Sequence, residues 1–202
     1  MANQAITPST QNLTARVADV ILKVVSRIPK SEEHASNTPR QRARSIANAA
    51  AAQAAMTAGA LALPPGPWGW FTVLPEIARV WQIQSQMVAD IAKLYGKYGS
   101  LNREQMLYCL FRHTASQAVR DLVVRVGQRY LVKKASIRVL TSVAGRIGVR
   151  VTHRAATSAV SRWIPIVGAV GIGAYAYYDT AQVARTAIEI FARDIETGPE
   201  AG

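Results

Sequence analysis

The segment Ile164-Pro-Ile-Val-Gly-Ala-Val-Gly-Ile-Gly-Ala-Tyr-Ala-Tyr-Tyr178 decides the fold class of this 202-residue chain. It has no charged residue, it starts with Pro165 at a helix-entry position, and it carries Gly168, Gly171 and Gly173. Each glycine inside a helix costs roughly 1 kcal/mol relative to alanine. Three of them together therefore indicate a helix surface that another helix backbone approaches closely.

A second charge-free segment runs from Ser45 to Pro75. Within it, Ala51, Ala55 and Gly59 recur every four residues and form a low ridge on one helix face. We expect the two segments to pack against each other as a central helical hairpin rich in alanine and glycine. The positions expected to make this contact, or to insert into a bilayer, are Gly59, Gly168, Gly171 and Gly173.

Burial as a hairpin is one of three interpretations that the two charge-free segments leave open. Shallow insertion into a membrane would use Trp68, Trp70 and Trp163, together with tyrosines 175, 177 and 178, as anchors at the membrane–water interface. A stable transmembrane pair is the weakest interpretation, because a span needs about 20 apolar residues. The first segment is interrupted by prolines 64, 65 and 67, and the second has 16 residues between Arg162 and Asp179.

Almost every segment repeats its apolar residues at the helical period, which predicts an all-α fold and a single compact multi-helix domain. We expect an N-terminal helix and polar linker over 1–37, a helical domain over 38–195 and a flexible tail over 196–202. The expected helices cover 12–28, 38–63, 76–94, 103–130, 136–160 and 165–195. In the fifth helix, one face should be apolar, with Ile137, Leu140, Ala144, Ile147, Val151 and Ala155.

Composition excludes several classes of protein. Half of the residues are apolar and 18% are charged, which excludes intrinsic disorder for the bulk of the chain. The single cysteine, Cys109, excludes an internal disulfide and fits a reducing compartment. The N-terminus lacks the basic start and apolar core of a signal peptide, so we expect a cytoplasmic protein, peripheral at the inner membrane.

Positive charge is concentrated in residues 121–162, which hold nine basic side chains and one acidic one, Asp121. This block supplies +8 of the net charge of +12. It is either a solvated face, a surface for anionic lipid head groups, or a weak nucleic-acid surface. The last is disfavoured, because only Tyr130 lies among the arginines as an aromatic platform for bases. The predicted anion-binding residues are Arg125, Arg129, Lys133, Lys134, Arg138, Arg146, Arg150 and Arg154.

Signals of catalysis are poor, and we predict no catalytic, cofactor-binding or metal-binding residues. The chain has no nucleophile elbow, phosphate-binding loop, HExxH or CxxC motif. His34, His113 and His153 lack the spacing of metal ligands. Cys109 and His113 lie four residues apart, which would suit a thiolate pair or half of a metal site, but a buried structural thiol is the simpler interpretation.

The order of these features resembles the EcsC family of bacterial proteins. The resemblance covers residues 40–195 and is carried by Leu63-Pro-Pro-Gly-Pro-Trp-Gly69, Leu74-Pro-Glu76, Ile91-Ala-Lys-Leu-Tyr-Gly96 and Ile164-Pro-Ile-Val-Gly-Ala-Val-Gly171. It implies a membrane-linked accessory role, since the family is named after a protein encoded beside an ABC transporter, and it implies no catalytic residues.

We therefore expect a non-enzymatic accessory or regulatory protein that binds an anionic phospholipid surface or a membrane protein through a basic amphipathic helix. Two alternatives stay open: a membrane-inserting component of the toxin–immunity type, and an enzyme that acts on lipid.

Overall fold

The computed structural model describes residues 8–61, 69–126, 128–158, 165–193 and 195–201. It contains six α-helices, a short 3-10 helix and a three-stranded sheet within these ranges. The helices are α1 (Pro8–Ser26), α2 (Pro39–Leu61), α3 (Gly69–Leu94), η1 (Tyr98–Ser100), α4 (Arg103–Val119), α5 (Ile137–Ser158) and α6 (Pro165–Phe191). The strands are β1 (Val123–Val126), β2 (Arg129–Ala135) and β3 (Ile195–Ala201).

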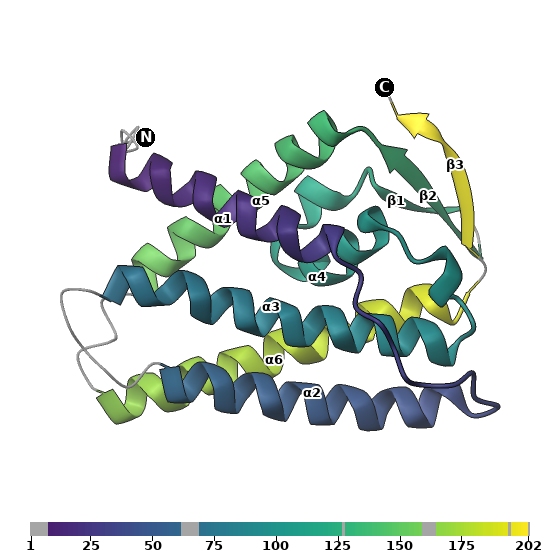
Figure 1. The fold of residues 1–202 in the computed structure, drawn as a ribbon, viewed down its shortest axis with the longest axis horizontal. Helices are drawn as coiled ribbons and strands as arrows, with labels where there is room; N and C mark the ends of the chain where they lie inside the picture. Colours follow the sequence, from purple (N-terminus) through teal and green to yellow (C-terminus); the bar gives the residue numbers. More distant parts are fainter. Residues whose placement is uncertain (1–7, 62–68, 127, 159–164, 194, 202) are drawn as a thin grey trace.

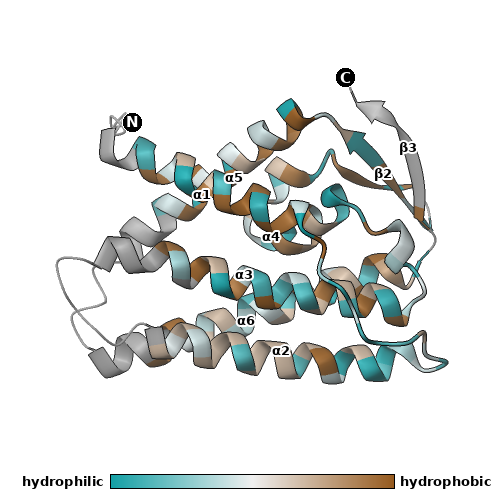
Figure 2. Cartoon of the chain, in the orientation of Figure 1, coloured by the Kyte–Doolittle hydropathy of each residue, from teal (hydrophilic) through white to brown (hydrophobic). Residues whose placement is uncertain are grey.

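The helices form two layers, and the small sheet lies at one end of the molecule (Figure 1). Helices α2, α3 and α6 pack side by side in one layer, and α1, α4 and α5 form the other. Polar and apolar residues alternate along α1 and α5 (Figure 2), as expected for helices that bury one face. The predicted helical class is thus confirmed, with the sheet as an addition to it.

The two charge-free segments pack against each other as α2 and α6, which confirms the predicted contact between them. At its centre, a Cβ atom placed on Gly173 would lie 3.1 Å from the carbonyl oxygen of Ala55 and 3.9 Å from the Cα of Gly59. Ala54 is fully buried beside this contact. The absence of a side chain at Gly173 therefore lets the two helix backbones approach each other.

The packing predicted for Gly171 is wrong, whereas its alternative, insertion into a bilayer, stays a prediction. This glycine is exposed on the outer side of α6, and a Cβ atom placed on it would meet no atom within 4 Å. Helical phase explains the difference, because Gly171 shares its face with the exposed Tyr175 and Tyr178, four and seven residues later. The surroundings of Gly168 lie outside the described residues.

A second close helix contact joins α1 to α5. A Cβ atom on Gly148 would lie 2.9 Å from the carbonyl oxygen of Thr14 and 3.6 Å from the backbone nitrogen of Ala18. In the part of α5 that precedes Gly148, Leu140, Ala144 and Ile147 are buried, as predicted for the apolar face of this helix. Ile137 is instead exposed, because it is the first residue of the helix and precedes the part that α1 covers.

The predicted helix over 103–130 is wrong beyond Val119, where the chain forms an antiparallel hairpin of β1 and β2. Val123-Val-Arg-Val126 and Tyr130-Leu-Val132 are rich in β-branched and aromatic residues, which favour strands. Val126 pairs with Arg129 at the end of the ladder that is nearest to the connection between the two strands. Tyr130 and Val132 face the core, while Leu131 between them is half-buried.

Residues 196–201 of the predicted flexible tail instead belong to β3, which starts at Ile195 and pairs in parallel with β2. The exposed edge of β2 offers unpaired backbone groups that an additional strand can satisfy. The buried carboxylate of Glu104 in α4 accepts a hydrogen bond of 2.9 Å from the backbone N–H of Ala135. This contact fixes the end of β2, and with it the start of α5, against α4.

Candidate functional site

The outer side of α5 forms a basic helix face, which we define as Arg138, Arg146 and Arg150. All three side chains are exposed, and their spacing of eight and four residues places them along one side of the helix. Helix α5 contains no acidic residue. Among the described residues, no salt bridge joins these arginines to a carboxylate. Arg154 follows one turn after Arg150, but its side chain is not described.

The hairpin that precedes α5 carries further positive charge. Arg125, Arg129 and Lys134 are exposed, and Lys133 is half-buried. Asp121, the one acidic residue in 121–162, is exposed and lies 3.5 Å from the guanidinium of Arg120, so it neutralises a charge outside this block. The predicted anion-binding residues therefore lie on a hairpin and a helix rather than on helices alone.

Three large apolar side chains are exposed within the same basic segment. Val126 and Ile137 are each 60% exposed, and Val149 is 49% exposed. Val126 lies at the tip of the hairpin, whereas Val149 lies between Arg146 and Arg150 on α5. Apolar side chains among cations are typical of surfaces that bind the boundary between lipid head groups and acyl chains.

A groove of about 570 Å³ runs between α4 and α5 beside the basic helix face. Its α5 side carries Arg146, Arg150 and His153, one to two turns apart. Its α4 side carries small and polar residues, namely Ala115, Gln117 and Ala118. Helix α4 departs from helical geometry at Ala115, with φ −139° and ψ 45°, so the groove lies where this helix is kinked.

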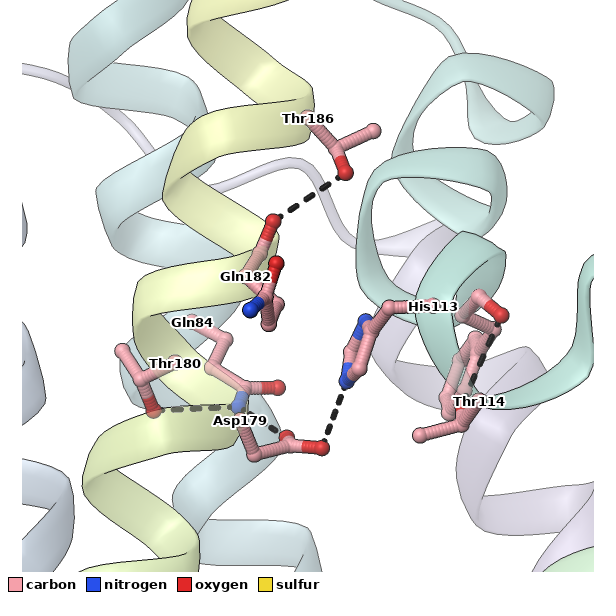
Figure 3. Close-up of polar contacts among 8 residues, drawn as sticks. Gln84, His113, Thr114, Asp179, Thr180, Gln182 and Thr186 are labelled. Carbon is pink, nitrogen blue, oxygen red and sulfur yellow. Dashed lines mark hydrogen bonds and ion pairs between the residues drawn. The ribbon is translucent and has the colours of Figure 1, made fainter.

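A second polar cluster lies between α3, α4 and α6 (Figure 3). The carboxylate of Asp179 accepts a hydrogen bond of 2.7 Å from the amide of Gln84 and lies 2.6 Å from Nε2 of His113. The same amide of Gln84 donates to Oγ1 of Thr180 at 3.1 Å. Asp179 thus joins three helices through one carboxylate that is largely buried.

The contact between His113 and Asp179 resembles that of a general base and its orienting carboxylate, but the other ring nitrogen of His113 is not exposed. Nδ1 of His113 is buried and has no hydrogen-bond partner among the described residues. The nearby hydroxyl of Thr180 contacts Gln84 rather than the imidazole. We therefore assign this cluster to the packing of α4 against α6.

A third cluster fixes the sheet against the helices. The carboxylate of Glu189 accepts hydrogen bonds of 2.6 Å from both the phenol of Tyr130 and the guanidinium of Arg112. Desolvation acts to raise the pKa of Glu189, but these two bonds, with the charges of Arg112 and Arg193, outweigh it and lower the pKa. Burial, and then the bond to Glu189, raise the pKa of Tyr130 to about 12.

Cys109 does not form a pair with His113. The thiol is fully buried, and burial raises its pKa, so the thiol is protonated at neutral pH. The imidazole contacts Asp179 on α6 instead. No group of three histidine, cysteine, aspartate or glutamate side chains in the described part of the chain could hold a metal ion.

The predicted interface aromatics are only partly described. Trp68 and Trp163 lie outside the described residues, and Trp70 is the second residue of α3, with a side chain that is not described. Tyr175, Tyr177 and Tyr178 are exposed on α6. Over the residues that the structure describes, none of the helices combines the length and apolarity needed to cross a bilayer.

Sequence reasoning missed Asp179 as a cluster residue and Ala115 as a kink. Asp179 carried a usable signal, because it falls between the buried Ala176 and Val183 on the inner face of α6. A carboxylate on a buried face needs partners, and the structure shows that these are Gln84 and His113. The kink at Ala115 carries no local signal, since alanine favours a regular helix.

The chain matches no protein-family model, and no curated protein and no solved structure matches it either. The resemblance to the EcsC family therefore stays a prediction from the quoted pieces of sequence.

Proposed function

We propose that this protein is a non-enzymatic accessory or regulatory protein that docks on an anionic membrane surface through α5. The observation that carries the proposal is the basic helix face, in which Arg138, Arg146 and Arg150 are exposed on a helix without acidic residues. Each cation near an anionic bilayer contributes about 1 kcal/mol, so three of them suffice for weak, reversible attachment.

Exposed apolar residues favour a membrane over a nucleic acid as the polyanion. Val149 lies within the basic helix face, and Val126 lies at the tip of the adjoining hairpin. Such side chains gain by leaving water for the acyl-chain boundary, whereas they gain nothing from a phosphodiester backbone. Single-stranded nucleic acid would require exposed aromatic platforms, and Tyr130, the aromatic residue of the hairpin, is buried.

The opposite side of α5 explains how the protein can present this helix face without unfolding. Helix α5 is held in the core by the buried Leu140, Ala144 and Ile147, and it packs closely against α1 at Gly148. The cations therefore stand on a rigid helix. Docking then requires no ordering of the chain, which removes an entropy cost that a flexible basic segment would have.

The charge-free segments of α2 and α6 favour docking rather than insertion as the first event. They bury their alanine and glycine faces against each other, and insertion would first have to separate this contact. We propose that the protein acts at the cytoplasmic side of the inner membrane, where the single thiol of Cys109 would stay reduced.

Vesicle binding tests the proposal. The protein is expected to co-sediment with vesicles of phosphatidylcholine and phosphatidylglycerol at low salt and to stay in solution with phosphatidylcholine alone. Added salt should release it, because exposed charges are screened beyond about 10 Å at 0.1 M ionic strength. Equal binding to neutral and anionic vesicles would contradict electrostatic docking, and binding that resists salt would favour insertion.

A further inference from the structure

The groove between α4 and α5 has the size of a small-molecule site and the charge of an anion site. Its volume of about 570 Å³ falls within the range of ligand pockets, roughly 300–1,000 Å³. Two of its lining residues are the exposed arginines Arg146 and Arg150, and a third is His153. The groove therefore offers more than the diffuse attraction of a charged surface.

Arg146 and Arg150 are placed to hold one anion together. Residues four apart on a helix have Cβ atoms about 5–6 Å from each other, so both side chains can reach a single tetrahedral group. A guanidinium binds phosphate oxygens with two parallel hydrogen bonds. Among the described residues, neither arginine has a carboxylate partner that would have to be displaced.

The other wall of the groove suits the remainder of a lipid head group. Ala115 and Ala118 on α4 are small, which leaves room beside the arginines, and Gln117 can donate to and accept from hydroxyl or ester oxygens. Val149 lines the same groove and is half-exposed. It is therefore placed to contact the first carbons of an acyl chain.

We infer that this groove binds the phosphomonoester head group of an anionic lipid, with Arg146 and Arg150 holding the phosphate. The inference rests on the proposed membrane docking and names the lipid class that the docking surface selects. A phosphomonoester carries a charge of about −1.5 to −2 at pH 7, whereas a phosphodiester carries one negative charge. Two adjacent guanidiniums therefore favour the monoester.

The experiment compares phosphatidic acid with phosphatidylserine in phosphatidylcholine vesicles that are matched in zeta potential. The wild-type protein is expected to bind phosphatidic acid vesicles about tenfold more tightly, the value of roughly one charged hydrogen bond. The double variant Arg146→Lys, Arg150→Lys keeps both charges but loses the paired hydrogen bonds. It should lose the preference while it still binds phosphatidylserine vesicles. Arg138→Lys, outside the groove, is the control and should keep the preference.

Each other outcome overturns a defined part of the inference. Equal binding of the wild type to both anionic vesicles would exclude a selective groove and leave membrane docking intact. If Arg138→Lys loses the preference for phosphatidic acid, or if the double variant keeps it, Arg146 and Arg150 are not the residues that select the lipid. Binding to neither vesicle would overturn the docking itself. Glycerol 3-phosphate is the soluble probe: if it binds as tightly as the vesicles, the ligand is a free phosphomonoester rather than a lipid.

Discussion

Gly173 in α6 lies directly against the backbone of Ala55 in α2, with 3.1 Å between the Cβ position of the glycine and the carbonyl oxygen of the alanine. This contact holds the two charge-free segments together as a pair of packed helices, and α3 packs against both of them. Gly171, two residues earlier, looks equivalent to Gly173 in the sequence, but it is exposed.

The pair Gly173→Leu and Gly171→Leu tests this difference. A leucine at position 173 would meet the backbone of Ala55 and Gly59, which cannot yield as a side chain can, and should cost about 1–3 kcal/mol or more of unfolding free energy. A leucine at 171 has open space and should stabilise by up to about 1 kcal/mol through helix propensity. Urea unfolding measures both, and equal effects of the two substitutions would contradict the assigned helix phase.

Two glycines of α5 provide a second matched pair. Gly148→Ala places a methyl group 2.9 Å from the carbonyl oxygen of Thr14, so we expect a loss of about 1–3 kcal/mol as α1 and α5 move apart. Gly145→Ala meets no atom within 4 Å and should gain up to about 1 kcal/mol. Thermal unfolding followed by circular dichroism distinguishes them. A Gly148→Ala protein as stable as the wild type would show that α1 does not cross α5 at this residue.

Asp179 should be needed for stability through its two partners. Asp179→Ala leaves the imidazole of His113 without its acceptor and leaves the amide of Gln84 with Thr180 alone, at a cost of about 3 kcal/mol. Asp179→Asn retains an acceptor oxygen for Gln84 and should cost less. Chemical denaturation measures the unfolding free energy of both variants. Equal losses for Asp179→Ala and Asp179→Asn would contradict the structural role assigned to the Asp179 carboxylate.

Tyr130 should give the stability of the protein a specific dependence on alkaline pH. Its pKa is raised from 10.0 to about 12 in the folded state, so folding favours the protonated phenol. The resulting stabilisation is complete below pH 10 and is lost as the pH rises toward 12. Tyr130→Phe should be less stable than the wild type by about 1.5–3 kcal/mol at pH 8, since it loses a bond to a charged acceptor.

The difference between the Tyr130→Phe variant and the wild type should then narrow by about 1 kcal/mol at pH 11. Comparison with the wild type cancels the contribution of the other tyrosines, because both proteins contain them. A difference that stays constant from pH 8 to pH 11 would mean that neither burial nor the bond to Glu189 raises the pKa of Tyr130.

The sequence predicts the helices well where one apolar stripe faces one partner, as in α1 and α5. It also predicts that α2 meets α6, because small residues are useful only where backbones approach. Helical phase could have identified Gly173, rather than Gly171, as the glycine that contacts α2. Gly173 precedes the buried Ala176, Thr180 and Val183 at spacings of three, seven and ten residues.

The hairpin and β3 were harder to predict, for a physical reason. The run Val123–Val126 is short, and a short apolar run fits a helix or a strand equally until its pairing partner is known. The strand β3 depends on the free edge of β2, a tertiary feature that no local pattern in Ile195–Ala201 reveals. The groove depends likewise on the kink at Ala115 and on how α4 faces α5.

We propose that the basic helix face of α5, and not the net charge of the chain, holds the protein on an anionic membrane. The most direct measurement compares two triple variants on phosphatidylcholine–phosphatidylglycerol vesicles. One variant carries Arg138→Glu, Arg146→Glu and Arg150→Glu. The other carries Arg27→Glu, Arg103→Glu and Arg185→Glu, which change the net charge equally at exposed positions on α4, α6 and the end of α1.

We predict that the α5 variant loses at least about 3 kcal/mol of binding free energy, roughly 150-fold in affinity. The control variant should lose much less, and both should keep the helical circular dichroism spectrum of the wild type. An equal loss of vesicle binding in the two variants would contradict the claim, because binding would then follow total charge rather than the basic helix face.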